Sequence, residues 1–368
     1  MELRLWALPV RGRSPRGSLE KILHPFRRDH PGLDVSLRTI SWGSAWDRLM
    51  SALKGRHAPA APDVFQVEAS WVGTLAHLGL LRDLTSLRAE GKREEGIREE
   101  GIRELWESCR FSGRLFAVPW TADIRVLRVR RDGVEEAGMS QNDLATWEGL
   151  EELARRAAAM RRPLFRSRRA EESVLLELAP WVWAGGGRFF SADGRRPEFL
   201  SEEALKAFSF YRDLSAAREG RGEPILEMDS LGEPAAAGRF VEPLPRGPSG
   251  RFTCLSGTVL GVAAGTSHIE ESTALLRHLA SPRSRASFAQ DMGLPPAAPP
   301  EEDGAFREAL AFARPLPSFA LLGGFERLFH RRLSAAARDA APWEAWRSAL
   351  ERVSRETEVL LTHYEPPA

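Results

Sequence analysis

Tryptophans that stand beside acids and glycines are the most distinctive chemical feature of this sequence. The chain contains 11 tryptophans but only two tyrosines. A flat indole face packs against the C–H face of a sugar ring, while a neighbouring carboxylate or arginine hydrogen-bonds to hydroxyl groups. The pairing therefore suits a polyhydroxylated ligand. Four segments carry it: residues 42–46 (Trp-Gly-Ser-Ala-Trp), 68–71 (Glu-Ala-Ser-Trp), 120–125 (Trp-Thr-Ala-Asp-Ile-Arg) and 181–187 (Trp-Val-Trp-Ala-Gly-Gly-Gly).

Each of these tryptophans has an alternative interpretation as a packing residue, because large aromatic side chains are usually buried. The positions of the four segments favour a binding site instead. They follow predicted strands, and open α/β sheets bind ligands at the carboxyl ends of their strands. The remaining tryptophans are expected to pack in the core: Trp6, Trp106, Trp147, Trp343 and Trp346.

Motifs of the common catalytic and nucleotide-binding sites are missing from the sequence. It has no GxGxxG after a strand, no GxxxxGK[ST] and no GxSxG. The eight histidines are scattered, and no CxxC or HExxH spacing indicates a metal site. We therefore expect neither a metal nor a cofactor, and no enzymatic activity.

The composition describes an ordinary globular chain. Its 368 residues favour two domains. With 52 basic and 51 acidic residues the net charge is +1, which gives no reason to expect nucleic acid or an anionic membrane as the main partner. No apolar run reaches the length of about 18 residues that a membrane span needs. Cys109 and Cys254 lie far apart, and the sequence leaves open whether they form a disulfide.

Short apolar strands alternate with amphipathic helices along most of the chain, which predicts an α/β fold with much parallel sheet. We expect residues 181–187 to form a loop and residues 219–250, rich in glycine and proline, to be irregular. No low-complexity linker separates two domains, so the chain must cross between them within ordered segments. The expected strands are 3–8, 33–40, 63–67, 116–120, 124–130 and 252–263, and the expected helices include 18–30, 45–54, 147–160, 201–218, 270–279, 282–290 and most of the chain after 305.

The same segments resemble the family 1 extracellular solute-binding proteins, the maltose-binding type that serve ABC sugar importers. The most specific stretch is residues 113–120 (Gly-Arg-Leu-Phe-Ala-Val-Pro-Trp) followed by Asp123 and Arg125. The resemblance covers nearly the whole chain, and it rests on the order and spacing of several short motifs. The others are residues 26–35, 41–46, 61–66 with Trp71, 78–84, 180–187, 243–247, 256–258 and 293–295.

This resemblance implies a type II periplasmic-binding-protein fold. Two α/β lobes would be joined by crossing strands and would close about this hinge over a sugar in the cleft. The N-terminal lobe would comprise residues 1–118 and 256–304, and the C-terminal lobe residues 119–255 and 305–368. The chain would cross between the lobes near residues 117–120 and 253–257.

The resemblance also implies which residues bind the ligand. Glu68 and Asp123 match cleft acids that accept hydrogen bonds from sugar hydroxyls, and Arg125 would brace Asp123 or donate to a hydroxyl. Small residues would let the backbone approach the ligand. The platforms would be Trp42, Trp71, Trp120 and Trp183, and the residues of close approach Gly186, Gly257 and Thr258, with Gly43 beside Trp42 completing the set.

Two departures from the family pattern leave a second interpretation open. The segment between Tyr211 and Pro243, which lines the cleft in the family, is shortened here, so that this wall is open or rebuilt. No export signal precedes the first predicted strand. We expect a monomeric, periplasmic or extracytoplasmic protein that passes a sugar to an ABC permease. The alternative, if Met1 is the true start, is a cytoplasmic scaffold that senses another ligand or a protein partner. A glycan-processing enzyme is the third and weakest interpretation.

Overall fold

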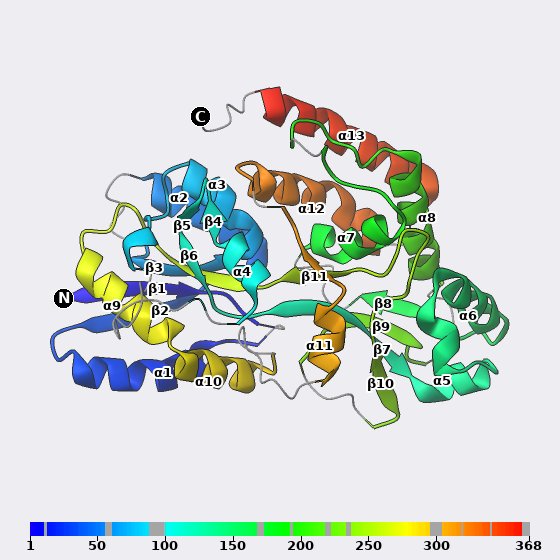
Figure 1. Ribbon diagram of the computed structural model, residues 1–368, viewed down its shortest axis with the longest axis horizontal. Coiled ribbons are helices and arrows are strands. Elements are labelled where there is room, and N and C mark those ends of the chain that lie inside the picture. Colours follow the sequence, from blue (N-terminus) through cyan, green and yellow to red (C-terminus); the bar gives the residue numbers. More distant parts are fainter. Residues whose placement is uncertain are drawn as a thin grey trace.

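Two α/β lobes lie side by side in the computed structural model (Figure 1). Each lobe has its own mixed sheet and its own apolar core. The structure describes residues 1–10, 13–55, 61–87, 99, 101–167, 173–191, 194–217, 222–232, 237–294, 304–317, 319–338 and 341–362.

The first lobe is built on a five-stranded sheet of order β2-β1-β3-β12-β6. Strands β1, β2 and β3 are parallel, while β12 runs antiparallel to both of its neighbours. The strands are β1 (Glu2–Ala7), β2 (Asp34–Thr39), β3 (Val64–Glu68), β6 (Ala117–Pro119) and β12 (Thr258–Val262). The helices of this lobe are α1 (Arg16–Asp29), α2 (Trp42–Lys54), η1 (Ala69–Trp71), α3 (Val72–His77), η2 (Thr85–Leu87), α4 (Arg103–Ser108), α9 (Ile269–Ala280) and α10 (Pro282–Met292), and a small hairpin joins β4 (Arg110–Phe111) to β5 (Arg114–Leu115).

The parallel strands follow from the sequence pattern. In α1, apolar residues at spacings of three and four face the sheet, as a helix period of 3.6 requires. They are Leu19, Ile22, Leu23 and Phe26, and all four are buried. The helix thus covers the sheet while the chain returns to start β2 beside β1, which confirms the predicted β-α-β arrangement.

The second lobe is built on a sheet of order β13-β11-β7-β9-β8, with β10 paired to β7. Its strands are β7 (Asp123–Arg130), β8 (Phe165–Ser167), β9 (Leu226–Ser230), β10 (Arg239–Glu242), β11 (Thr253–Ser256) and β13 (Ala313–Pro315). Its helices are α5 (Arg131–Glu136), η3 (Gln141–Ala145), α6 (Trp147–Ala159), α7 (Val174–Ala184), α8 (Glu202–Ala216), α11 (Gly304–Leu310), α12 (Leu322–Arg338) and α13 (Trp343–Thr362).

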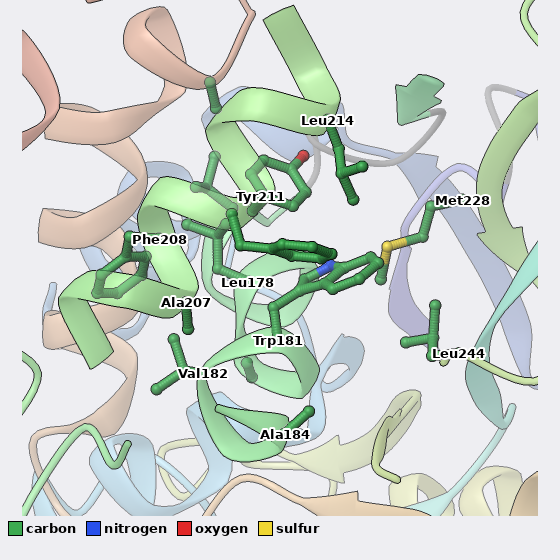
Figure 2. Close-up of a cluster of buried hydrophobic side chains, with 14 of the residues drawn as sticks. Leu178, Trp181, Val182, Ala184, Ala207, Phe208, Tyr211, Leu214, Met228 and Leu244 are labelled. Carbon is green, nitrogen blue, oxygen red and sulfur yellow. The ribbon is translucent and has the colours of Figure 1, made fainter. Parts of the chain in front are cut away.

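Two sequence predictions for this lobe were wrong. Trp181–Ala184 are not a loop, because they form the last turn of α7, and only the three glycines after them leave the helix. Trp181 is 1% exposed and packs between α7 and α8 beside Tyr211 and Met228 (Figure 2). The segment 219–250 is not irregular throughout: β9 pairs with both β7 and β8, and the five residues of β9 are buried.

Within the described residues, the chain passes between the lobes where β6 leads to β7 and again where β11 leads to β12 (Figure 1). The two segments pack backbone against backbone: a Cβ atom on Gly257 would lie 2.0 Å from the carbonyl oxygen of Thr121. The backbone N–H groups of Trp120 and Thr121 donate to the carbonyl oxygen of Thr258, at 2.9 and 3.1 Å. Gly257 is therefore required by this close approach.

Both cysteines are buried, and neither is in a disulfide. Cys109 belongs to the core of the first lobe and Cys254 to the core of the second, so the possible bond between them does not form. Among the described helices, none combines the length and the apolar character that crossing a bilayer requires.

We predict that Gly257→Ala lowers the stability of the protein. The added methyl group overlaps the Thr121 carbonyl, and overpacking of this kind costs about 1–3 kcal/mol. Urea unfolding of the variant and the wild type measures the difference.

The matched control is Gly43→Ala in the first turn of α2, where an added Cβ atom would have no neighbour within 4 Å. Alanine favours a helix over glycine by about 0.5–1 kcal/mol, so this variant should be at least as stable as the wild type. Equal midpoints for the two variants would contradict the role of Gly257.

Candidate functional site

Five of the predicted site residues meet where the two crossing segments pack together. Glu68 ends β3, and its Oε1 accepts the backbone N–H of Gly257 at 3.3 Å. Thr258 lies opposite Glu68 in the β3–β12 ladder. On β7, the carboxylate of Asp123 and the guanidinium of Arg125 form an ion pair at 3.5 Å. The structure therefore brings together Glu68, Asp123, Arg125, Gly257 and Thr258, all from strand ends.

Burial governs the chemistry of this cluster. Glu68 and Asp123 are each 8% exposed and Arg125 only 2%. Burial raises the pKa of the Glu68 carboxyl well above its ordinary value, and the nearby Glu326 and Asp123 raise it further. The guanidinium of Arg125 offsets part of this effect. Burial and the neighbouring acids therefore make Glu68 harder to ionise here than in water.

Glu177 on α7 adds another buried carboxyl to the neighbourhood of Arg125. Its Oε1 accepts the phenolic O–H of Tyr211 at 3.1 Å. Burial raises the pKa of Glu177, and the positive charge of Arg125 acts in the opposite direction. Acidic side chains from both lobes thus share the field of one buried guanidinium.

Glu326 is a site residue that the sequence interpretation missed. It lies on α12 and is 5% exposed, and its carboxylate accepts hydrogen bonds from Ser70, Trp71 and Ser173. No motif marks it, but one signal was available. It lies on the apolar stripe of an amphipathic helix, among Leu322, Phe325 and Phe329, and a buried polar residue on such a stripe is informative.

Three tryptophans of the first lobe form an aromatic cluster beside these acids. The ring of Trp71 makes edge contacts with Trp42 at 6.3 Å and with Trp46 at 5.1 Å between centroids. The indole N–H of Trp42 donates to the carbonyl oxygen of Pro9 at 2.8 Å, which fixes its ring. Trp46 belongs to the motif at residues 42–46, but it is not among the predicted site residues.

A groove of about 370 Å³ opens beside Trp46, between α2 of the first lobe and the helices α12 and α13 of the second. Its surface is mostly carbon. It is lined by Trp46, Gly324, Arg327, Leu328, Arg331, Glu356, Val359 and Leu360. The groove therefore joins an indole to charged groups across the boundary between the lobes.

The other predicted site residues lie in different surroundings. Trp120 is 1% exposed and its ring packs on Phe288 at 4.7 Å, so the structure favours the packing alternative for this residue. Trp183 packs against the core of the second lobe. A Cβ atom on Gly186 would lie 2.5 Å from the hydroxyl of Ser249, also in the second lobe. Gly43 lies in the first turn of α2 and has no close neighbour.

The side chains of the site are suited to hydrogen bonding and to stacking against a flat ligand. Within the described part of the chain, no group of three or more His, Cys, Asp or Glu side chains is placed to hold a metal ion. The site offers carboxylate acceptors, arginine donors and indole surface.

We predict that Glu68→Gln changes how stability depends on pH. Because the pKa of Glu68 is raised in the folded state, the folded protein holds a proton at pH values where the unfolded chain has lost it. The contribution of Glu68 to the free energy of unfolding is therefore greatest below its ordinary pKa of 4.5 and falls as the pH rises. Glutamine does not titrate, so the free energy of unfolding of the variant relative to that of the wild type should increase with pH. Urea midpoints across the pH range measure it.

The exposed Glu135 provides the control, because Glu135→Gln alters no buried carboxyl. Parallel pH profiles for the wild type and Glu68→Gln would mean that Glu68 does not titrate as its burial requires.

Several known structures share this architecture over almost the full chain. The acarbose-binding GacH receptor of Streptomyces glaucescens is similar with a TM-score of 0.79 at 17% identity, and the alignment covers 99% of this chain and 100% of that one. The maltose-bound MalE3 protein of T. maritima gives 0.77 at 22% identity, with coverages of 98% and 99%. A solute-binding protein of Agrobacterium vitis with bound D-mannitol gives 0.76 at 16%, again with 98% and 99%.

These similarities confirm the predicted two-lobe fold of the maltose-binding type. The model of the bacterial extracellular solute-binding protein family matches residues 21–220, which is more than half of the chain. That segment includes the tryptophan cluster, Glu68, the first crossing segment and the helices α7 and α8. The chain belongs to the family of bacterial extracellular solute-binding proteins.

Proposed function

We propose that this protein binds a sugar or oligosaccharide non-covalently between its two lobes and delivers it to an ABC importer. The observation that carries the proposal is Trp46, which belongs to the tryptophan cluster of the first lobe and lines a groove bounded by the second. Proteins of the same fold were solved with acarbose, maltose and D-mannitol, ligands that are all rich in hydroxyl groups.

The groove has the chemistry that a sugar needs. The carbon-rich lining contacts the C–H faces of a pyranose ring, and the indole of Trp46 offers a flat surface for stacking. Arg327, Arg331 and Glu356 lie at the edge, where hydroxyl groups find both donors and acceptors. The buried residues Glu68, Asp123 and Arg125 lie where the two crossing segments meet, and opening of the lobes would expose them to the ligand.

We further propose how the chain divides. Residues 1–118 and 256–304 form the N-terminal lobe, and residues 119–255 and 305–368 the C-terminal lobe. The backbone contact between Gly257 and Thr121 supports a hinge at this crossing, because it ties the two connecting segments into one unit. The lobes would rotate about it to admit and enclose the sugar.

The proposal includes a partner and a location. A binding protein of this family acts outside the cytoplasm, so we place the chain in the extracytoplasmic space, as a monomer that passes its sugar to an ABC permease. We propose that it is a carrier and not an enzyme. The buried acids in the floor are held by hydrogen bonds and by Arg125, as befits groups that position a ligand.

One observation favours a second function. The carboxylate of Glu326 in the second lobe accepts hydrogen bonds from the Ser70 hydroxyl and the Trp71 indole N–H of the first lobe, so these donors are already paired in the unliganded protein. A protein that closes on its own side chains is suited to sensing another ligand or a protein partner on the same scaffold. This candidate predicts no response to sugars.

We predict that one class of sugar raises the melting temperature and changes the tryptophan fluorescence, and that Trp46→Ala weakens its binding at least tenfold. Loss of the stacking surface supplies the reason. Thermal shift and fluorescence titration across a panel of mono- and oligosaccharides measure it. A ligand that binds only the folded state adds about 2.7 kcal/mol to the stability at 100 times its Kd.

Trp343→Ala is the matched control, since Trp343 is also half-buried but packs in the second lobe. It should leave the affinity unchanged. A flat response of the wild type to the whole panel would refute the sugar proposal and favour the sensing scaffold. Equal losses in both variants would mean that Trp46 does not contact the sugar.

A further inference from the structure

The helix α12 forms a direct contact between the lobes. It packs against α7 and α13 of the second lobe and against η1 and α3 of the first. At its start, the backbone N–H of Gly323 donates to the hydroxyl of Thr74 at 3.0 Å. A Cβ atom on Gly323 would lie 2.7 Å from the ring of Trp46. The first turns of α12 are thus fitted closely to the first lobe.

The carboxylate of Glu326 is the polar centre of this contact. Its Oε1 accepts the hydroxyl of Ser173 at 2.6 Å, and Ser173 also caps the N-terminus of α7. Its Oε2 accepts the hydroxyl of Ser70, and the side chain of Trp71 donates to the same carboxyl. One side chain therefore joins donors from both lobes while remaining 5% exposed.

A second carboxyl lies close to this one. Glu68 of β3 interacts electrostatically with Glu326, and both groups are buried. Burial raises the pKa of each carboxyl, and their mutual repulsion raises that of Glu68 further. Two carboxylates that are close together and shielded from water do not both ionise readily, so the closed form disfavours loss of the second proton.

The other charged groups around the pair come from four elements. Asp123 on β7 adds negative charge and Arg125 on the same strand adds positive charge. Glu177 on α7 lies near Arg125. On α12 itself, Arg327 pairs with Asp47 of α2 at the surface, and His330 follows Glu326 by one turn. Histidine is the side chain that ordinarily changes charge near neutral pH, so His330 is the group from which the effect of the pair must be distinguished.

We propose that Glu326 is a proton-dependent latch between the lobes. While Glu326 and Glu68 share a proton, the latch holds the unliganded protein closed. When that proton is lost, the lobes are free to open. Opening admits water to both carboxyls and lets both ionise. Closure therefore takes up a proton, and acid favours the closed form. The latch would regulate the proposed sugar site, but it needs no sugar to operate.

The experiment is small-angle X-ray scattering of the full chain without ligand, at about pH 5 and about pH 8. We expect the radius of gyration of the wild type to increase with pH. When closure takes up one proton, the ratio of closed to open molecules falls by up to about tenfold per pH unit between the pKa values of the two forms.

Three variants test the mechanism. Glu326→Gln keeps an acceptor oxygen without a charge, so it should stay compact at both pH values. Glu326→Ala removes the latch and should be extended at both. His330→Gln is the control and should respond to pH like the wild type. Circular dichroism and thermal unfolding establish that each variant is folded, and Glu326→Gln decides the question even where Glu326→Ala does not fold.

Two outcomes would overturn the proposal. One is a wild type whose radius of gyration is the same at both pH values. The other is a pH response that survives in Glu326→Gln or disappears in His330→Gln. Because the measurement contains no sugar, its failure is distinct from failure of the sugar panel: a protein that binds sugar without any pH response refutes only the latch.

Discussion

The backbone contact between Gly257 and Thr121 is the constraint on which the rest of the structure depends. It sets the distance between the two crossing segments at a value that excludes any side chain at position 257. Because of it, β3 and β12 of one sheet and β7 and β11 of the other end beside the same point. The acids of both lobes meet there for that reason, and the proposed hinge at this point would move the lobes without separating the strands.

The alternation of apolar strands with amphipathic helices was enough to predict most of this fold. It placed β1, α1, β2 and β3 to within a few residues. The elements α1 and β2 bury one face and expose the other, whereas β3 is a short apolar run that is buried throughout. The failures have a physical reason. Trp181 and Val182 are buried on a helix that is apolar all round, so no period distinguished α7 from a buried loop. Strand β9 carries Glu227 and Asp229, whose charges are paired with arginines across the sheet, and an isolated sequence does not reveal such partners.

The site was partly predictable for a similar reason. Glu68 and Asp123 stand at strand ends, where the chain order itself indicates the edge of a sheet. Trp120 stands at such an end as well, but its indole turns into the core onto Phe288, and the direction of a side chain is not written in its spacing. Glu326 lies more than 250 residues from Ser70 along the chain, and only the packing of α12 across both lobes brings them together.

The Glu326 contact bears on how strongly any ligand can bind. The Ser70 and Trp71 donors already bind the Glu326 carboxyl, so a ligand that bound at these donors would replace those hydrogen bonds rather than add to them. The apparent affinity then equals the intrinsic affinity reduced by the fraction of molecules that are open. In the proposed latch, the protonation of the Glu326 and Glu68 pair would set this fraction. The residue most important for affinity would then be one that the sugar displaces, and it lies outside the motifs by which the family is recognised.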